Sequence, residues 1–314
     1  MAVYRWHLEN AAQDELQRIA RTQIDRALGE LDEGDRHHAV HAVRKRGKKV
    51  RALLRLVRPA APELYRRENA AFRDMMRRVA SDRDAGVAVE TFDGLLARFS
   101  EDGIAEELAP VRAALAQRRA EVLGEELDRR LHLIRMDLVA AGERVGDWRL
   151  EGDGFDVLEG GLAKTYGRAR ARRADAYSDA TSAAFHLWRK RTKYHRYHLR
   201  LLQDAWTPVV KAHRRQAHEL TDLLGDDHDL AVLRQDLLGQ PERFGGERSV
   251  AAVCGLLDRR RAELQSAARV VGQRCFAEEP KRFASRLRSY WESASATAPG
   301  GAGPLADPTV PPGR

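Results

Sequence analysis

Hydrophobic residues recur along most of the chain at intervals of three or four positions, with charged residues between them. The spacing is clear in two stretches: Leu16, Ile19, Ile24, Leu28 and Leu31, then Leu108, Val111, Leu115 and Val122. Intervals of this kind match the 3.6-residue turn of an amphipathic helix. Runs of alternating β-branched residues, which would indicate strands, are absent from the sequence. The pattern therefore predicts an all-α protein.

The prolines mark where the predicted helices begin and end. Six of the 11 prolines stand where one helical pattern stops or the next starts: Pro59, Pro62, Pro110, Pro208, Pro241 and Pro280. A missing N–H costs least at such positions. The other five fall in residues 293–314, which are rich in Ser, Ala, Gly and Pro. That stretch cannot bury enough apolar surface to offset its ordering entropy, so we expect a disordered C-terminal tail.

Two segments of the chain resemble each other at an offset of 145 residues. The run His41-Ala-Val-Arg-Lys-Arg-Gly-Lys matches His186-Leu-Trp-Arg-Lys-Arg-Thr-Lys, and the 81–84 segment matches 226–229. The repeat predicts two units, at residues 1–145 and 146–292, with the tail at 293–314. Each unit is long enough for four helices. We therefore expect two tandem four-helix bundles related by an internal pseudo-twofold.

Positive charge is concentrated in the two matching segments. The chain has 55 Lys and Arg against 47 Asp and Glu. Residues 41–58 hold eight of the basic residues and residues 186–200 hold six, and neither segment contains an acid. The rest of the chain is therefore slightly acidic. Concentrated charge of one sign favours the capture of an anion.

On a helical wheel each segment has one cationic face and one apolar face. The first face carries His41, Arg44, Lys45, Lys48, Arg51 and Arg55, and the second carries His186, Arg189, Lys190, Lys193, Arg196, Tyr197 and Arg200. Val43, Val50, Leu53, Leu54 and Val57 take the opposite side of the first helix, and Trp188, Leu199 and Leu202 that of the second. A basic face is usually only solvated. Here like charges repel at i, i+3 and i, i+4 spacing without acids between them, so we expect an anion to offset the repulsion.

The residue types indicate which anion fits. Arg supplies bidentate forks and Lys a compact charge, and a row as long as a helix suits an extended polyanion better than one small ligand. Like charge around His41 and His186 disfavours their protonated forms, so both are expected to be neutral hydrogen-bond donors to phosphate oxygens.

The doubled pattern His-x-x-Arg-Lys-Arg-x-Lys-x-x-Arg-x-x-x-Arg, followed about 40 residues later by the 81–84 and 224–229 segments, resembles the CHAD domain family. The resemblance covers roughly residues 5–290. It implies two helical bundles whose cationic helices line a central groove or pore, and it implies binding of inorganic polyphosphate, with granule association in some members. Lys164, Tyr166 and Arg168, which resemble the family's Tyr-x-Arg helix, are second-tier candidates. The Glu-x-Glu-x-Lys signature of the triphosphate tunnel module that many relatives carry is absent, so we expect a binder without hydrolase activity.

Three other functions remain to be weighed. His228 and Asp229 suggest a metal-dependent phosphohydrolase of the HD type. Arg83, which is not a metal ligand, stands at the position of the first unit that matches His228, and N-capping explains Asp84 and Asp229 more simply than metal binding does.

Nucleic acid is another candidate ligand because its backbone carries the same phosphate charge. However, few aromatic residues and no base-reading Asn or Gln accompany the basic faces. A membrane surface would need apolar faces that the core requires.

Composition limits the remaining possibilities. Two cysteines, Cys254 and Cys275, give neither a disulfide framework nor a zinc-site spacing. The N-terminus resembles neither a signal peptide nor a membrane anchor. We therefore expect a cytoplasmic protein without a metal or cofactor. The resemblance to the CHAD domain family adds the expectation of a non-catalytic protein with inorganic polyphosphate as its partner, granule-associated where polyphosphate is stored.

Overall fold

The computed structural model describes residues 4–32, 36–79, 81–99, 108–121 and 125–297, and these residues form α- and 3₁₀-helices and contain no strand. The first six α-helices are α1 (Ala12–Asp32), α2 (Arg36–Leu56), α3 (Pro62–Arg77), α4 (Ser81–Arg98), α5 (Ala109–Glu121) and α6 (Glu125–Arg144). They are followed by α7 (Asp156–Asp179), α8 (Ser182–Leu201), α9 (Thr207–Gly239), α10 (Gly246–Cys275) and α11 (Pro280–Thr297). The all-α prediction is confirmed.

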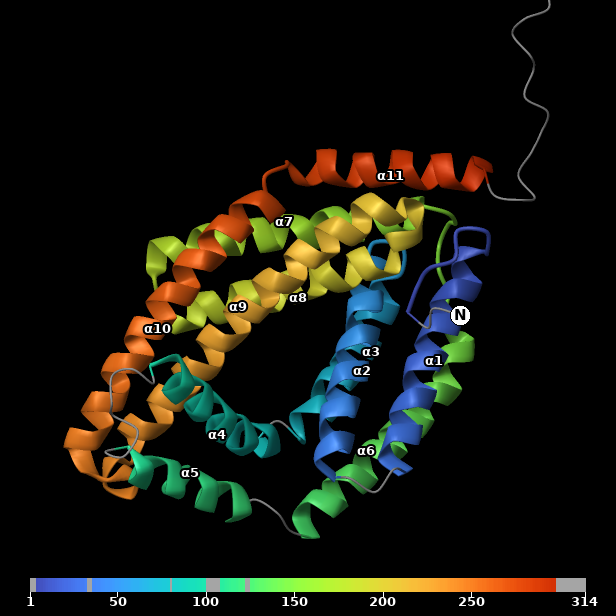
Figure 1. The fold of residues 1–314 in the computed structure, drawn as a ribbon. Helices are drawn as coiled ribbons and strands as arrows, with labels where there is room; N and C mark the ends of the chain where they lie inside the picture. The colour runs from blue at the N-terminus through green and yellow to red at the C-terminus, as the bar shows by residue number, and fades with distance from the viewer. Residues whose placement is uncertain (1–3, 33–35, 80, 100–107, 122–124, 298–314) are drawn as a thin grey trace, which may run out of the picture.

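The helices form a layer with two arms (Figure 1). The layer consists of α7, α8 and α9, with α11 lying along one side of it. One arm contains α1, α2, α3 and α6, and the other is formed largely by α10 and the distal part of α9, with α4 and α5 reaching back toward the first arm. The same contact pattern occurs twice, because α1 packs on α2 and α6 while α7 packs on α8 and α11.

The apolar faces predicted for α2 and α8 form part of the core. Val43, Leu53 and Leu54 are fully buried, as are Trp188 and Leu199. The six punctuating prolines also lie at helix starts or in the links between helices. Helix positions and core faces therefore follow from the local pattern of the sequence.

The hydrophobic clusters do not divide the chain into the two expected four-helix bundles. One cluster joins α1, α2, α3 and α6 to α7, α8 and α11 across the boundary at residue 145. The other joins α4 and α5 to the distal parts of α9 and α10, with Phe92 and Val111 facing the region of Leu237 and Val253. The reason is length: α9 and α10 have 33 and 30 residues. Their far ends would expose apolar side chains if α4 and α5 did not cover them.

Two local expectations are corrected. Asp229 does not cap a helix, because α9 runs unbroken through Gly225. Buried neighbours such as Leu224 and Asp227 hold the helix together there, and this outweighs the cost of about 1 kcal/mol for an interior glycine. Residues 293–297, which were expected to belong to the tail, complete α11. Residues 298–314 and the side chains of Arg83 and Asp84 lie outside the described part, so the expectations for them stay untested.

Candidate anion-binding site

The cationic faces of α2 and α8 meet where the two helices cross. The Nε2–H of His198 on α8 donates to the carbonyl oxygen of Ala52 on α2 over 2.9 Å. Burial lowers the pKa of His198 to about 4, so the ring is neutral at pH 7. The Arg55 guanidinium lies 4.0 Å from the centre of the Tyr194 ring. This junction fixes the two basic faces relative to each other.

One cavity beside the crossing, which we call the cationic cavity, has a volume of about 480 Å³. Its walls come from α1, α2, α8 and α9, together with the N-terminal segment. Its lining consists of Lys and Arg side chains with two histidines and two tyrosines, namely Tyr4, Arg26, His41, Arg44, Lys45, Arg46, Lys48, Lys49, Lys193, Arg196, Tyr197, Arg200, Arg214 and His218. A space lined in this way has a positive potential, which the pairing of Arg46 with Glu30 at 2.6 Å reduces in part.

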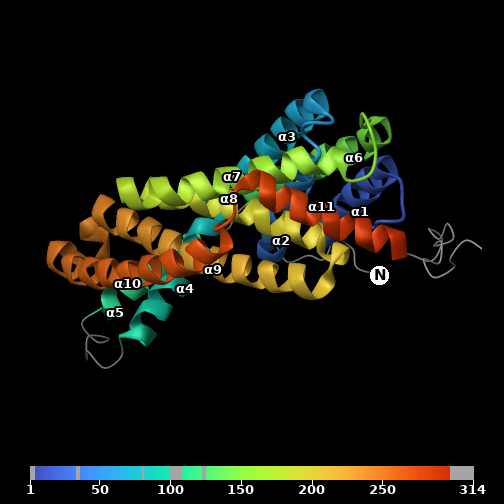
Figure 2. The same ribbon diagram turned by 90° about the horizontal axis from the view of Figure 1, so that it is seen from above.

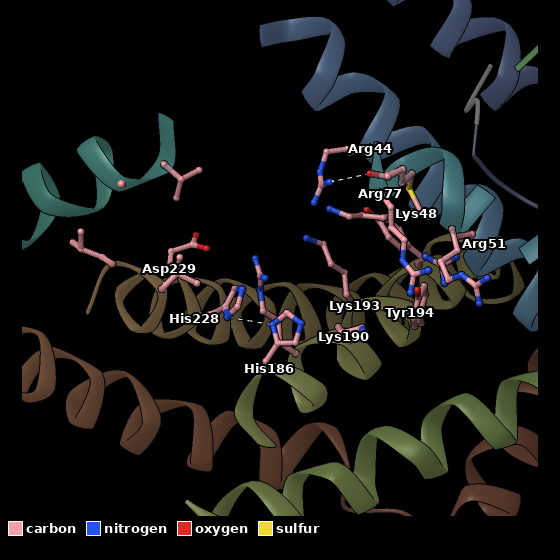
Figure 3. Close-up of a pocket in the computed structure, with 18 residues that line it drawn as sticks. Arg44, Lys48, Arg51, Arg77, His186, Lys190, Lys193, Tyr194, His228 and Asp229 are labelled. Atoms are coloured by element: carbon pink, nitrogen blue, oxygen red, sulfur yellow. Dashed lines mark hydrogen bonds between the residues drawn. The ribbon is translucent and has the colours of Figure 1, made fainter. Parts of the chain in front are cut away.

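A second cavity, which we call the mixed cavity, has a volume of about 350 Å³ and lies between α2, α3, α4, α8 and α9 (Figure 3). Its cations are Arg44, Lys48, Arg51, Arg73, Arg77, Arg189, Lys190 and Lys193. Its other lining residues are Tyr194, Tyr197, His186, His228, Asp229, Met76, Val87, Ala88, Val232 and Leu233. The cations gather toward α2 and α3, whereas the histidines and Asp229 lie toward α4.

The two cavities share four lining residues. Arg44 and Lys48 of α2 and Lys193 and Tyr197 of α8 face both of them. The two cavities are therefore adjacent and are joined through these shared side chains, and we call the pair the connected space. Of the 15 residues proposed from the sequence, 12 line this space.

The remaining three line a separate small recess. Arg55, Lys164 and Arg168 surround a space of about 10 Å³, which is at most the size of one water molecule. Arg55 also makes a hydrogen bond within its own helix, because its NH1 donates to the carbonyl oxygen of Arg51 over 2.8 Å. Tyr166 is a core residue, only 1% exposed and stacked on Phe283 with ring centroids 4.3 Å apart. The structure therefore does not bring the second-tier residues into the connected space.

Hydrogen bonds to main-chain and side-chain atoms orient several of the cations, and the Nδ1 of His218, one of these partners, also lies 2.8 Å from Asp222 Oδ2. Arg44 donates to the main-chain oxygens of Met76 and Val79 at 3.3 Å, near the carboxyl end of α3. Arg51 donates from Nε to Asn69 Oδ1 over 3.0 Å, and Arg196 donates to His218 Nδ1 over 2.9 Å. These contacts orient the guanidinium groups in the walls of the two cavities.

His186 forms a pair with His228, and their Nδ1 atoms are 3.2 Å apart. Burial, followed by the influence of His228 and of Lys190, lowers the pKa of His186 to about 4. The ring is therefore neutral at pH 7, as the sequence predicts, although burial rather than like charge is the larger cause. His41 is exposed and lines the cationic cavity.

Lys49 is the most unusual ionisable group of the site. Its side chain is 6% exposed, and its Nζ lies 5.1 Å from the centre of the Tyr4 ring. Burial, followed by the charges of Arg46 and Arg200, lowers its pKa to about 7. Lys49 is therefore only partly protonated at neutral pH, and a bound anion would favour its charged form.

We expect Lys49 to make anion binding depend on pH between about 6 and 8. The ammonium is present below the folded-state pKa and is lost as pH rises through it, so affinity falls with rising pH. Lys49→Met should remove that part of the pH dependence. It should also raise the melting temperature at pH 7, because the unfolded chain protonates Lys49 more readily than the folded protein does. Calorimetric titrations at pH 6, 7 and 8 check this, with Lys48→Met as control. An unchanged pH profile for Lys49→Met would exclude this role.

Sequence reasoning missed the cations that other helices add to the site. Arg26 comes from α1, Arg73 and Arg77 come from α3, and Arg214 comes from α9. Arg26, Arg73 and Arg77 each have an acidic residue within three positions, so no charge run marks them. Arg214 lies in a short basic run at 211–215 that the repeated motif does not include. The repeat offset could have indicated two further lining residues. Arg73 of the mixed cavity and His218 of the cationic cavity are 145 positions apart, as are the two basic helices.

The described residues contain no group of three or more His, Cys, Asp or Glu side chains arranged to hold a metal ion. His228 and Asp229 lie on the wall of the mixed cavity, with His186 as the ring partner of His228. Among the described helices, none combines the length and the apolar character needed to cross a bilayer.

Comparison with known proteins identifies the family. The CHAD domain model matches residues 18–238, a range that includes both basic helices, and the chain therefore belongs to the CHAD domain family. The crystal structure of the CHAD domain from the plant Ricinus communis is similar in fold, with 20% sequence identity and a TM-score of 0.56. The match covers 87% of this chain and 93% of that chain. A search of curated proteins finds no match.

Proposed function

We propose that this protein binds inorganic polyphosphate in the connected space between α2 and α8. The observation that carries the proposal is the convergence of two acid-free basic faces, 145 residues apart in sequence, on shared cavities. Membership of a family associated with polyphosphate binding in general supports it.

The arrangement suits a chain better than a single phosphate. The cationic cavity and the mixed cavity lie on either side of Arg44, Lys48 and Lys193. A linear polyanion passing between the cavities would contact these three side chains and then the separate cations of each cavity. Arginine forks and lysine ammonium groups would bind successive phosphates by charge-assisted hydrogen bonds. The crowded cations of the free protein gain stability when an anion enters, since their mutual repulsion is offset.

Nucleic acid is the second candidate, because its backbone carries the same charge. Tyr194 and Tyr197 line the mixed cavity but are each less than 10% exposed, so they offer little surface for stacking bases. Titrations with long-chain polyphosphate, tripolyphosphate and single-stranded DNA at physiological salt separate the candidates. Polyphosphate should bind more tightly than DNA at equal phosphate concentration, and equal competition by DNA would overturn the proposal.

Binding should weaken steeply with salt. If about six phosphates are contacted, affinity should fall on the order of 10²–10³-fold between 50 and 200 mM NaCl, because each contact releases condensed counterions. Calorimetry or fluorescence anisotropy across this range gives the slope. The variant lacking three cations, described in the Discussion, should show a smaller slope. A slope near zero would contradict binding by charge.

The proposed role is non-catalytic and cytoplasmic, with association to polyphosphate granules where these form. The corresponding packing of α1, α2 and α6 and of α7, α8 and α11 supports an origin by duplication, with a pseudo-twofold that relates the basic helices. Incubation with polyphosphate under conditions that preserve binding tests the absence of catalysis. Release of free phosphate in proportion to protein would show an enzyme instead.

A further inference from the structure

One end of the mixed cavity contains side chains that bare polyphosphate does not need. Val87 and Ala88 of α4 face Val232 and Leu233 of α9, and Asp229 lies beside them. Apolar side chains gain nothing from phosphate oxygens, and a carboxylate repels them. The cationic cavity has neither feature in its lining. The two cavities therefore differ in the ligand chemistry that they favour.

Hydrogen-bonding groups accompany this apolar end. The Nδ1 atoms of His186 and His228 lie 3.2 Å apart, and burial makes the His186 ring neutral at pH 7. A neutral imidazole carries one hydrogen-bond donor and one acceptor, so His186 adds a polar group to this end of the cavity. Asp229, the next residue after His228, adds carboxylate oxygens that accept O–H or N–H donors. Figure 3 places these three side chains at the end away from Arg51.

The cations begin directly beside this end. Along α8 the lining residues run from His186 through Arg189 to Lys193, a rise of roughly 10 Å at 1.5 Å per residue. Arg44 and Lys48 of α2 face the same stretch. The volume of about 350 Å³ falls in the range of small-molecule sites. A ligand that fits has an anionic chain at one end and a partly apolar group with hydrogen-bond donors at the other.

We propose that the mixed cavity binds the nucleoside end of a nucleoside polyphosphate. The phosphates lie on Arg44, Lys48 and Lys193, and the nucleoside lies between α4 and α9 with a hydroxyl or amino hydrogen donated to Asp229. The inference rests on the proposed function only because the phosphates use the same cations. The inference adds nucleoside polyphosphates as a distinct class of ligand, which the mixed cavity binds through the nucleoside.

The test compares ATP with inorganic tripolyphosphate, which has the same number of phosphates and carries more charge. A site that recognises charge alone prefers tripolyphosphate. We expect ATP to bind about tenfold more tightly. Asp229→Ala should then act in opposite directions, weakening ATP several-fold by removing an acceptor and strengthening tripolyphosphate by removing a like charge. A purely structural role for Asp229 would change both affinities in the same direction.

Control variants and probes complete the test. Asp175→Ala removes an exposed carboxylate on α7, outside both cavities, and should change neither affinity. Farnesyl diphosphate has an apolar group without donors, and it should gain nothing from Asp229. If ATP binds no more tightly than tripolyphosphate, or if Asp229→Ala shifts both alike, the inference is overturned while polyphosphate binding stands. If long-chain polyphosphate itself does not bind, the proposed function fails.

Discussion

Replacing Arg44, Lys48 and Lys193 together with alanine should lower polyphosphate affinity on the order of 10³-fold, since each charge-assisted contact contributes about 1.5 kcal/mol. These are the three cations that face both cavities, so their loss interrupts the positive potential at the point where the two spaces connect. Isothermal titration with long-chain polyphosphate at physiological salt measures the change.

The matched control removes one arginine and two lysines from elsewhere on the surface. Arg112, Lys211 and Lys281 are exposed, and none of them lines either cavity. Their triple alanine variant has the same net charge as the site variant, so it corrects for the general attraction of a basic protein. Equal losses in the two variants would show that net charge, rather than the site, governs binding.

Gly161→Ala should destabilise the protein by several kcal/mol or prevent folding. A Cβ atom at Gly161 on α7 would lie 1.8 Å from the carbonyl oxygen of Leu56 and 2.7 Å from that of Arg55. Both obstacles are backbone atoms at the end of α2, so the helices would have to separate and lose buried packing across the main core. Chemical denaturation with circular dichroism gives the change in unfolding free energy.

Gly255→Ala on α10 is the matched control, because a Cβ atom there meets nothing within 4 Å. Alanine is favoured over glycine inside a helix by up to about 1 kcal/mol, so this variant should be slightly more stable. If Gly161→Ala were as stable as the wild type, the close approach of α7 to α2 would be wrong. The orientation of α2 against the α7–α9 layer, on which the shared cavities depend, would then need revision.

The sequence predicted the helices, their buried faces and the two basic faces because all of these are set by local spacing. Trp188 and Leu53 fall on the core side of an amphipathic helix whichever partner covers them. The partners themselves depend on tertiary packing. Nothing local indicates that α4 and α5 cover the far ends of α9 and α10, or that Gly225 lies inside a continuous helix.

The candidate site shows the same division. A helical wheel places Arg44 and Lys48 on one face, and the repeat places Lys193 at the equivalent position on α8. The crossing at Ala52 and His198, which joins these residues into one space, is a tertiary contact without a sequence signature. Arg26 and Arg214 reach the site from helices of mixed charge, and Arg55, expected in the groove, instead packs on Tyr194. The sequence therefore predicts which residues form the basic faces, whereas the meeting of the two faces at one site depends on the tertiary structure.

Lysine protection measures most directly whether both basic helices bind one chain. The protein has eight lysines, and Lys48 of α2 and Lys193 of α8 face both cavities, whereas Lys281 of α11 is exposed and lines neither cavity. Limited acetylation followed by mass spectrometry, with and without saturating polyphosphate, gives the protection of each lysine. The account predicts that Lys48 and Lys193 are protected together, at the same polyphosphate concentration, while Lys281 reacts at its original rate. Protection confined to one helix, or equal protection of all three lysines, would contradict it.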